Sequence, residues 1–210
     1  PGKLGTAVML AKSPGVIAGL PVAAQVWQLL DPAVAFEPLV EDGVFVDAGV
    51  PIARVTGSAR SLLSGERVAL NFVQRMSGVA TKTRAFVEAI AGHKAQLVDT
   101  RKTTPGLRQF EKYAVRCGGG RNHRFGLADA VMIKDNHIAL AGGIAAAVAN
   151  ARAVVPFTAR IEVECENLGM VEQALAAGAD VIMLDNMTRE AMAAAVGVIA
   201  GRALVEASGG

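Results

Sequence analysis

The stretch Val181-Ile182-Met183-Leu184-Asp185 is a short apolar run that ends in a carboxylate, and similar runs occur elsewhere in the chain. They cover residues 96–100, 131–135, 160–164 and 203–208, and each ends in a polar or charged cluster. Helical patterns at 143–154, 168–177 and 189–200 separate most of them. A repeated strand-then-helix order predicts parallel strands joined by crossover helices. Polar residues at the carboxyl ends of such strands are typical of the active site of a (β/α) barrel or of an open doubly wound sheet, and the pattern leaves both open.

The first third of the chain has a different pattern. Residues 44–55 mix alternating apolar residues with a Gly-Val-Pro turn, which predicts a hairpin. Between residues 66 and 90 apolar residues recur every three or four positions, which predicts a helix that Ser64 caps and Gly92 ends. We therefore expect an N-terminal domain with a long connecting helix over residues 1–92, and a catalytic domain over residues 93–210.

The composition narrows the class of protein. Hydrophobic residues make up 52% of the chain and charged residues 19%, which indicates a globular protein with a core rather than a disordered one. The net charge of +2 argues against nucleic acid as the main partner. Cys117 and Cys165 are the only cysteines, so we expect no disulfide framework and a cytoplasmic location. No apolar run approaches the roughly 20 residues of a membrane helix, so we expect no membrane partner.

Residues 99–126 are strongly basic. Seven Lys or Arg stand against two acids, a local charge of +5, and the segment also holds Thr103-Thr104-Pro105-Gly106 and Gly118-Gly119-Gly120. Arginine forks bind carboxylate or phosphate groups, and glycine amides can approach them closely. The segment therefore predicts a site for an anionic small molecule, and a solvated basic loop is the alternative.

Acidic residues gather on the later predicted strands. Glu162 and Glu164 are two positions apart and therefore face the same side, and Asp185 ends the next strand. Such carboxylates either hold Mg²⁺ through its waters or form structural ion pairs with nearby arginines. We interpret His137 as a hydrogen-bonded loop residue and Cys117 as a small buried residue, since no nucleophilic triad can be assigned around it.

Several blocks together resemble the quinolinate phosphoribosyltransferase family in order and spacing. The blocks are residues 66–72, 77–81, 99–108 (Asp-Thr-Arg-Lys-Thr-Thr-Pro-Gly-Leu-Arg), 118–124 (Gly-Gly-Gly-Arg-Asn-His-Arg), 134–137 (Lys-Asp-Asn-His), 162–164 (Glu-Val-Glu), 184–186 (Leu-Asp-Asn) and 206–210 (Glu-Ala-Ser-Gly-Gly). The resemblance covers nearly the whole chain, and many blocks in register are far more specific than any one of them.

The resemblance implies an α/β fold, with an N-terminal α/β sandwich followed by an open (β/α) barrel of the type II phosphoribosyltransferase kind. It also implies that further segments precede Pro1 and follow Gly210, so that both domains are truncated. A homodimer with shared active sites, or a higher oligomer, is implied as well. Arg101, His123, Arg124 and Lys134 would bind quinolinate, and Arg67 would reach the same pocket from the neighbouring subunit. Lys102, Glu164, Asp185, Ser208 and Gly209 would bind phosphoribosyl pyrophosphate, with Mg²⁺ held at Glu164 and Asp185.

The implied reaction converts quinolinate and phosphoribosyl pyrophosphate to nicotinate mononucleotide, diphosphate and carbon dioxide, in NAD biosynthesis. Lys102, Lys134, Glu164 and Asp185 would be its catalytic residues. Two alternatives stay open: a paralogous phosphoribosyltransferase of the molybdenum-operon type, which uses another acceptor, and a module that binds dicarboxylates without turnover.

Overall fold

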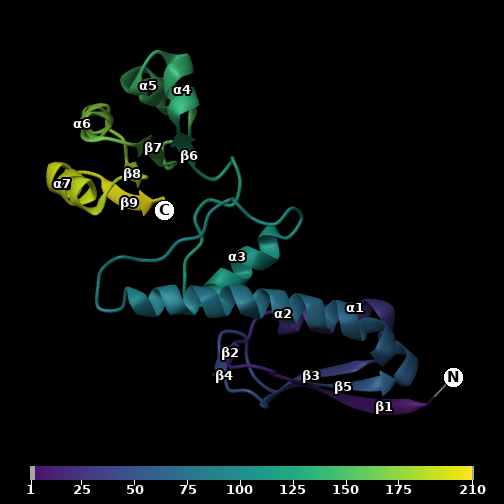
Figure 1. Ribbon diagram of the computed structural model, residues 1–210. Helices are drawn as coiled ribbons and strands as arrows, with labels where there is room; N and C mark the ends of the chain where they lie inside the picture. The colour runs from purple at the N-terminus through teal and green to yellow at the C-terminus, as the bar shows by residue number, and fades with distance from the viewer. Residues whose placement is uncertain (1–2, 210) are drawn as a thin grey trace. The chain divides into compact units, whose positions relative to one another are not determined.

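The computed structural model describes residues 3–209, and the chain folds into two compact units, residues 1–123 and 124–210 (Figure 1). The described residues leave out Pro1, Gly2 and Gly210. The outer ends of the two expected domains and the last residue of the final family block are among these. The domain boundary that the sequence predicts after residue 92 stays a prediction. By packing alone, the loop and helix that follow residue 92 group with the first unit.

The first unit is built on antiparallel strands and long helices. Strands β1 (Leu4–Leu10), β5 (Pro51–Ser58) and β3 (Ala35–Pro38) form one sheet in that order, and β2 (Gly15–Val16) pairs with β4 (Phe45–Val46). Helices α1 (Leu20–Leu30) and α2 (Ala59–Ala89) lie over the three-stranded sheet, and α3 (Arg108–Cys117) packs on α2 (Figure 1). This is the N-terminal sheet domain that the resemblance implied.

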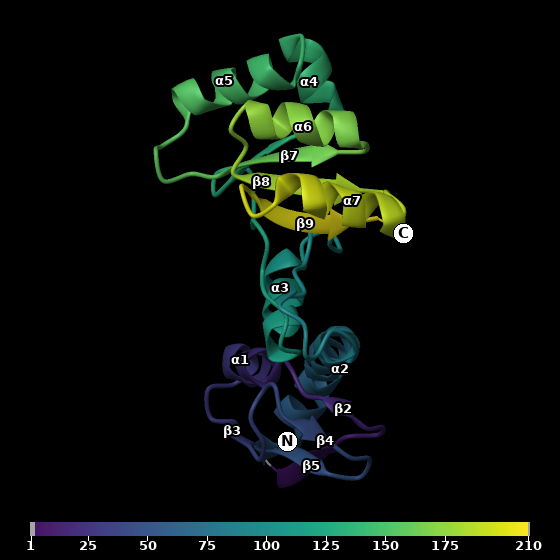
Figure 2. The ribbon, with the colours of Figure 1, turned by 90° about the vertical axis from the view of Figure 1, so that its left-hand side faces the viewer.

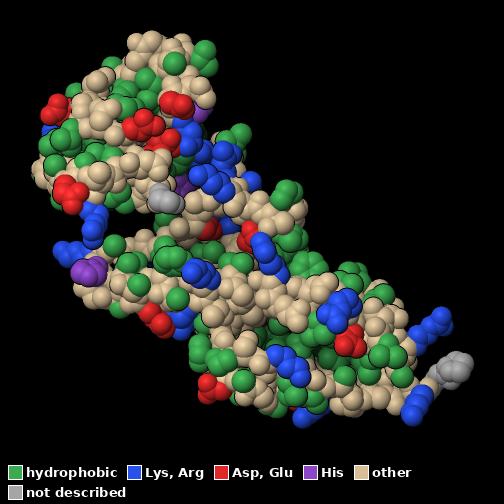
Figure 3. All heavy atoms as spheres, in the orientation of Figure 1, with side chains coloured by type: hydrophobic (Ala, Val, Ile, Leu, Met, Phe, Trp, Pro, Cys, Tyr) green, Lys and Arg blue, Asp and Glu red, His purple; other side chains and the backbone are tan. Residues whose placement is uncertain are grey.

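A close approach between α1 and α2 organises the core of this unit. The Trp27 indole nitrogen donates to the Leu62 carbonyl at 3.3 Å, and both side chains belong to the main buried cluster. A Cβ atom added at Gly65 would lie 2.4 Å from that indole nitrogen, so the crossing requires glycine there. Some large hydrophobic side chains of this unit are exposed, among them Val8, Leu10 and Leu63. Figure 3 shows hydrophobic side chains on the surface of this unit.

Two local predictions for this unit are wrong. Residues 44–55 do not form a hairpin, because β4 pairs with β2 while β5 pairs with β1 and β3. A turn at Gly49, whose φ is 86°, sends the two strands into different sheets. The long helix begins at Ala59 rather than near residue 66, and its cap is Ser58, whose hydroxyl accepts from the Ser61 amide at 3.1 Å.

The second unit is a parallel α/β layer, as the strand-then-helix pattern predicted. Strands β6 (Val131–Ile133), β7 (Ile161–Cys165), β8 (Val181–Asp185) and β9 (Leu204–Ser208) are hydrogen-bonded in chain order. Helices α4 (Asp135–Ala141), α5 (Ile144–Val154), α6 (Leu168–Ala176) and α7 (Arg189–Ile199) alternate with them. The run at residues 96–100 is not one of these strands, because only Val98 forms a bridge, with Arg121.

One face of the parallel sheet is covered by helices. Figures 1 and 2 show α5, α6 and α7 on the same side of the strands. The fully buried side chains of β7 and β8, such as Ile161, Val163 and Ile182, share one cluster with residues of these helices. Within residues 3–209, no single helix has the length and apolarity to cross a membrane, although the bent pair α4 and α5 together meets those two criteria.

Candidate functional site

The uncovered face of the parallel sheet collects the polar side chains. Side chains alternate along a strand, so Glu162 and Glu164 point away from the face that buries Ile161 and Val163. Paired residues of parallel strands share a face, and the register pairs Glu164 with Met183 and Met183 with Glu206. The same register pairs Asp185 with Ser208 at the ends of their strands. The predicted residues Glu164, Asp185 and Ser208 therefore lie on one face.

Lys134 and Glu164 form an ion pair on this face. The Lys134 ammonium donates to a Glu164 carboxylate oxygen, and the two residues stand at the carboxyl ends of neighbouring strands. The Glu164 side chain is 14% exposed, so the contact is partly shielded from solvent. The sequence prediction assigned Lys134 to quinolinate and Glu164 to phosphoribosyl pyrophosphate, and the fold brings them into direct contact.

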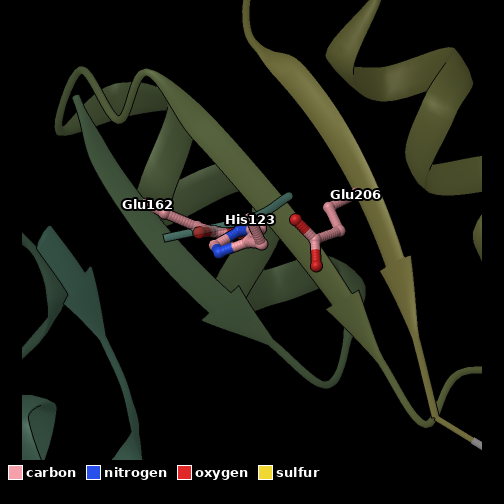
Figure 4. Close-up of side chains that lie close together, drawn as sticks. All are labelled: His123, Glu162 and Glu206. Atoms are coloured by element: carbon pink, nitrogen blue, oxygen red, sulfur yellow. The ribbon is translucent and has the colours of Figure 1, made fainter. Parts of the chain in front are cut away.

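A second pair of acids lies on this face, and of its two members only Glu162 was considered from the sequence. The carboxyl groups of Glu162 and Glu206 hydrogen-bond to each other and are directed toward one another in Figure 4, which also draws His123 of the other unit. Burial first, and then the Glu206 carboxylate, raise the pKa of Glu162 to about 8. Glu162 therefore keeps its proton near neutral pH, because burial and the adjacent Glu206 carboxylate both disfavour its charged form.

Arg124 lies over the same face. One of its guanidinium nitrogens is 3.2 Å from the Met132 sulfur, and Met132 is the register partner of Glu162. The positive charge of Arg124 favours the ionised form of Glu162, opposing the burial and the Glu206 carboxylate. The two-residue spacing of Glu162 and Glu164 in the sequence predicts that both side chains lie on one face of the sheet. Their neighbour Glu206 could be identified only from the strand register.

Asn186, which follows β8, lies close to Ser208 and Gly209 at the end of β9. The Asn186 amide donates to the Ser208 carbonyl at 2.9 Å, and the Asn186 side chain donates to Asp185 at 2.8 Å. Asn186 has a φ of 52° and Gly209 a φ of 115°, both left-handed. A Cβ atom added at Gly209 would lie 2.5 to 2.9 Å from Asn186 atoms, so the close approach requires glycine at position 209.

The remaining predicted residues belong to the first unit. Arg101 and Lys102 lie in the loop between α2 and α3, where the Thr100 hydroxyl accepts from the Lys102 amide at 3.0 Å. Arg67 is exposed on α2. His123 ends the unit, and its amide donates to Asp99 at 2.8 Å.

Two expectations about the basic segment need correction. Lys112 cannot bind a ligand from solvent, because it is 3% exposed and its ammonium lies 2.5 Å from an Asp99 oxygen. Gly118 serves packing rather than ligand approach, because an added Cβ atom would lie 2.4 Å from the Ala80 carbonyl oxygen of α2. The local charge of +5 therefore overstates what this segment offers to an anion.

The two other side chains considered from the sequence are structural. His137 lies in the first turn of α4 rather than in a loop, and its Nδ1 accepts from the Lys134 amide at 2.9 Å, which confirms that it is hydrogen-bonded. Cys117 is half-buried rather than buried as expected, and this burial still raises the pKa of its thiol, so the group is not poised as a thiolate nucleophile.

Both parts of the chain match models of a known protein family. Residues 79–210 match the family profile for "Quinolinate phosphoribosyl transferase, C-terminal domain", and residues 1–77 match that for the N-terminal domain. The chain belongs to the quinolinate phosphoribosyltransferase family. The resemblance drawn from the motifs is thereby confirmed.

Individual relatives agree with this membership. The chain is 54% identical over 195 residues to a probable nicotinate-nucleotide pyrophosphorylase [carboxylating] of Synechocystis, a match that covers 93% of this chain and 66% of that protein. The corresponding Bacillus subtilis protein is 47% identical over 97% of this chain and 71% of its own length. Among solved structures, NadC from Streptococcus pyogenes is 50% identical with a TM-score of 0.94, over 99% of this chain and 74% of that one.

The chain thus spans about two thirds of the length of these curated relatives. The expected fold, a sheet domain followed by a parallel α/β domain, is confirmed by the close structural match. The individual roles predicted for the site residues stay predictions. Their placement is compatible with those roles, because the residues of the second unit share one face of the sheet or its carboxyl edge.

Proposed function

We propose that the protein catalyses the reaction of quinolinate with phosphoribosyl pyrophosphate to give nicotinate mononucleotide, diphosphate and carbon dioxide, as a pentosyltransferase of NAD biosynthesis in the cytoplasm. The observation that carries the proposal is the polar sheet face, where Lys134, Glu164, Asp185 and Ser208 stand at the carboxyl ends of adjacent parallel strands. Family membership and the names of the relatives support it.

Quinolinate carries carboxylates on two neighbouring ring carbons, one of which is next to the ring nitrogen, so its site needs several cations. We assign Arg101, His123, Arg124 and Lys134 to these carboxylates, in line with the family motifs. A guanidinium fork matches a carboxylate in two hydrogen bonds, which orients the ring as well as binding it. Correct orientation matters because the ring nitrogen must face the anomeric carbon that it attacks.

Phosphoribosyl pyrophosphate is assigned to Lys102, Glu164, Asp185, Ser208 and Gly209. Glu164 and Asp185 supply carboxylate oxygens from neighbouring strands on one face, a donor set that suits Mg²⁺. Bound there with the diphosphate, Mg²⁺ would offset the negative charge that grows on the leaving group. Lys102 offsets the same charge, while the carboxylates favour the positive charge that develops on the sugar ring.

Lys134 connects the two halves of this assignment. Lys134 pairs with Glu164, which we assign to phosphoribosyl pyrophosphate. A quinolinate carboxylate held by Lys134 would therefore lie next to Glu164. After the ring nitrogen is alkylated, the ring becomes an electron sink. The adjacent carboxylate then leaves as carbon dioxide, and the electron pair left on that ring carbon takes up a proton from solvent. Cations that hold the other carboxylate keep the ring oriented during that loss.

Arg67 is assigned to the partner's site in a homodimer. It is exposed on α2, within a block that matches the family, and an exposed cation on this helix is able to reach a second subunit. An active site shared in this way would make turnover depend on dimer formation.

The proposal is tested by measuring carbon dioxide released from carboxyl-labelled quinolinate in the presence of phosphoribosyl pyrophosphate and Mg²⁺. Release that requires all three components is expected. Turnover with another acceptor and none with quinolinate would favour the molybdenum-operon type of paralogue. Binding of quinolinate without turnover would favour a dicarboxylate-binding module.

A further inference from the structure

One face of α3 carries three charged side chains that hold the neighbouring loops. Arg108, Glu111 and Lys112 follow the spacing i, i+3, i+4, which places them on the same side of the helix. None of the three is fully exposed, and Lys112 is almost completely buried. Such charges have to be paired within the protein, and their partners lie in the two segments that carry predicted substrate-binding residues.

The first partner segment is the loop that contains Arg101. Arg108 donates to the Arg101 carbonyl at 3.1 Å and to the Thr103 hydroxyl at 3.1 Å. Glu111 accepts from the Thr104 amide at 3.1 Å and from its hydroxyl at 2.8 Å, and it pairs with Arg75 at 2.6 Å. The main chain is therefore held on both sides of Lys102.

The second partner segment ends at His123. Asp99 accepts from the His123 amide at 2.8 Å, and the Lys112 ammonium donates to the His123 carbonyl at 3.2 Å. Lys112 and Asp99 are themselves joined at 2.5 Å, with side chains 4% and 8% exposed. Asn122 adds bonds to Asp99 at 2.7 Å and to the Lys112 carbonyl at 2.8 Å. Both backbone polar groups of His123 are thus bound by one buried ion pair.

We infer that this face of α3 positions the quinolinate-binding residues without touching the substrate, and that the buried Lys112–Asp99 pair sets the place of His123. The inference rests on the proposed function, which assigns His123 and Arg101 to quinolinate. Binding of a planar dicarboxylate depends on the position of its cations to within a fraction of an ångström, and supporting contacts of this kind supply that precision. Lys112 and Asp99 are positioning residues, because their charged groups contact each other and the His123 main chain.

The test is steady-state kinetics of a double variant, Asp99→Asn with Lys112→Met. Removing both charges leaves no unpaired ion in the interior, so the variant is expected to fold. We expect KM for quinolinate to rise about tenfold, because a misplaced cation weakens substrate binding, while KM for phosphoribosyl pyrophosphate changes less than about twofold. Lys94→Met, which removes an exposed lysine of the same unit, is the matched control and should leave both constants unchanged.

The outcomes separate the possible failures. A purely structural role for the pair would lower the amount of active enzyme and hence kcat for both substrates, with both KM values unchanged, and that result overturns the inference. If the double variant does not fold, Asn122→Ala removes two of the same contacts from an exposed side chain and should raise KM for quinolinate in the same direction. If the unmodified protein releases no carbon dioxide from quinolinate, the proposed function fails and this inference fails with it.

Discussion

The Glu162–Glu206 pair makes a quantitative prediction about stability and pH. The folded protein raises the pKa of Glu162 from its ordinary 4.5 to about 8, so folded chains keep the proton over a range where unfolded chains lose it. The unfolded state then binds fewer protons, and the free energy of unfolding must fall as pH rises from about 5 to 8. The Glu162→Gln variant stays neutral in both states and lacks this contribution.

The magnitude follows from the size of the shift. A change from 4.5 to about 8 corresponds at most to about 5 kcal/mol, at 1.36 kcal/mol for each pKa unit. Arg124 favours the ionised form of Glu162, and solvent screens part of the interaction. We therefore expect about 2 kcal/mol of stabilisation of Glu162→Gln relative to the unmodified protein at pH 9, and no more than a few tenths at pH 5.

The measurement is urea unfolding at intervals between pH 5 and pH 9, in buffer containing a chelator so that bound metal does not contribute. Glu172→Gln is the matched control, because it makes the same change at an exposed position of α6. A difference between Glu162→Gln and the unmodified protein that stays constant across the whole pH range would refute the raised pKa of Glu162. A slope that Glu172→Gln also removes would point to net charge rather than to the pair.

Three further predictions concern the proposed reaction. Calorimetry should show that quinolinate binds at least about tenfold more tightly than nicotinate, because nicotinate lacks one carboxylate for the cations to bind. Equal affinities would remove the support for quinolinate as substrate. Asp185→Asn should raise the Mg²⁺ concentration needed for half-maximal activity, and an unchanged Mg²⁺ dependence would mean that Asp185 has no metal role. Mixing inactive Arg67→Ala and Lys134→Ala subunits should restore up to about a quarter of the activity, since a mixed dimer has one intact site. If subunit exchange is verified and no activity returns, Arg67 acts in the site of its own chain.

The helices and strands that could be predicted from the sequence are those whose own pattern of apolar and polar side chains determines their secondary structure. The run Val181–Asp185 is a strand with those bounds, because a continuous apolar segment between two amphipathic helices has no other way to be buried. The helical patterns at 143–154, 168–177 and 189–200 matched α5, α6 and α7 to within one or two residues. The family motifs added the membership, and the register of β7, β8 and β9 explains why those motifs recur at strand ends.

The errors arose where tertiary contacts decide the structure. Residues 96–100 resemble a strand, yet their amides and carbonyls bond to the Arg121 region through a single bridge. Helix α3 was not predicted because it lies between two glycine-rich or proline-containing loops and carries many charges. Lys112 was counted in the local charge of +5 because its partner Asp99 is in a loop, and sequence spacing does not reveal that contact.

The contact between the Asn186 and Gly209 backbones has a consequence for how this protein can vary during evolution. A side chain at position 209 fits only if the turn at Asn186 moves, and that turn is bonded to the end of β9 through the Ser208 carbonyl. Neither loop is therefore free to change on its own. Position 209 is expected to stay glycine whichever residue stands at 186, because its φ of 115° and the Asn186 backbone both exclude a side chain, so the strand ends that carry Asp185 and Ser208 keep a fixed spacing.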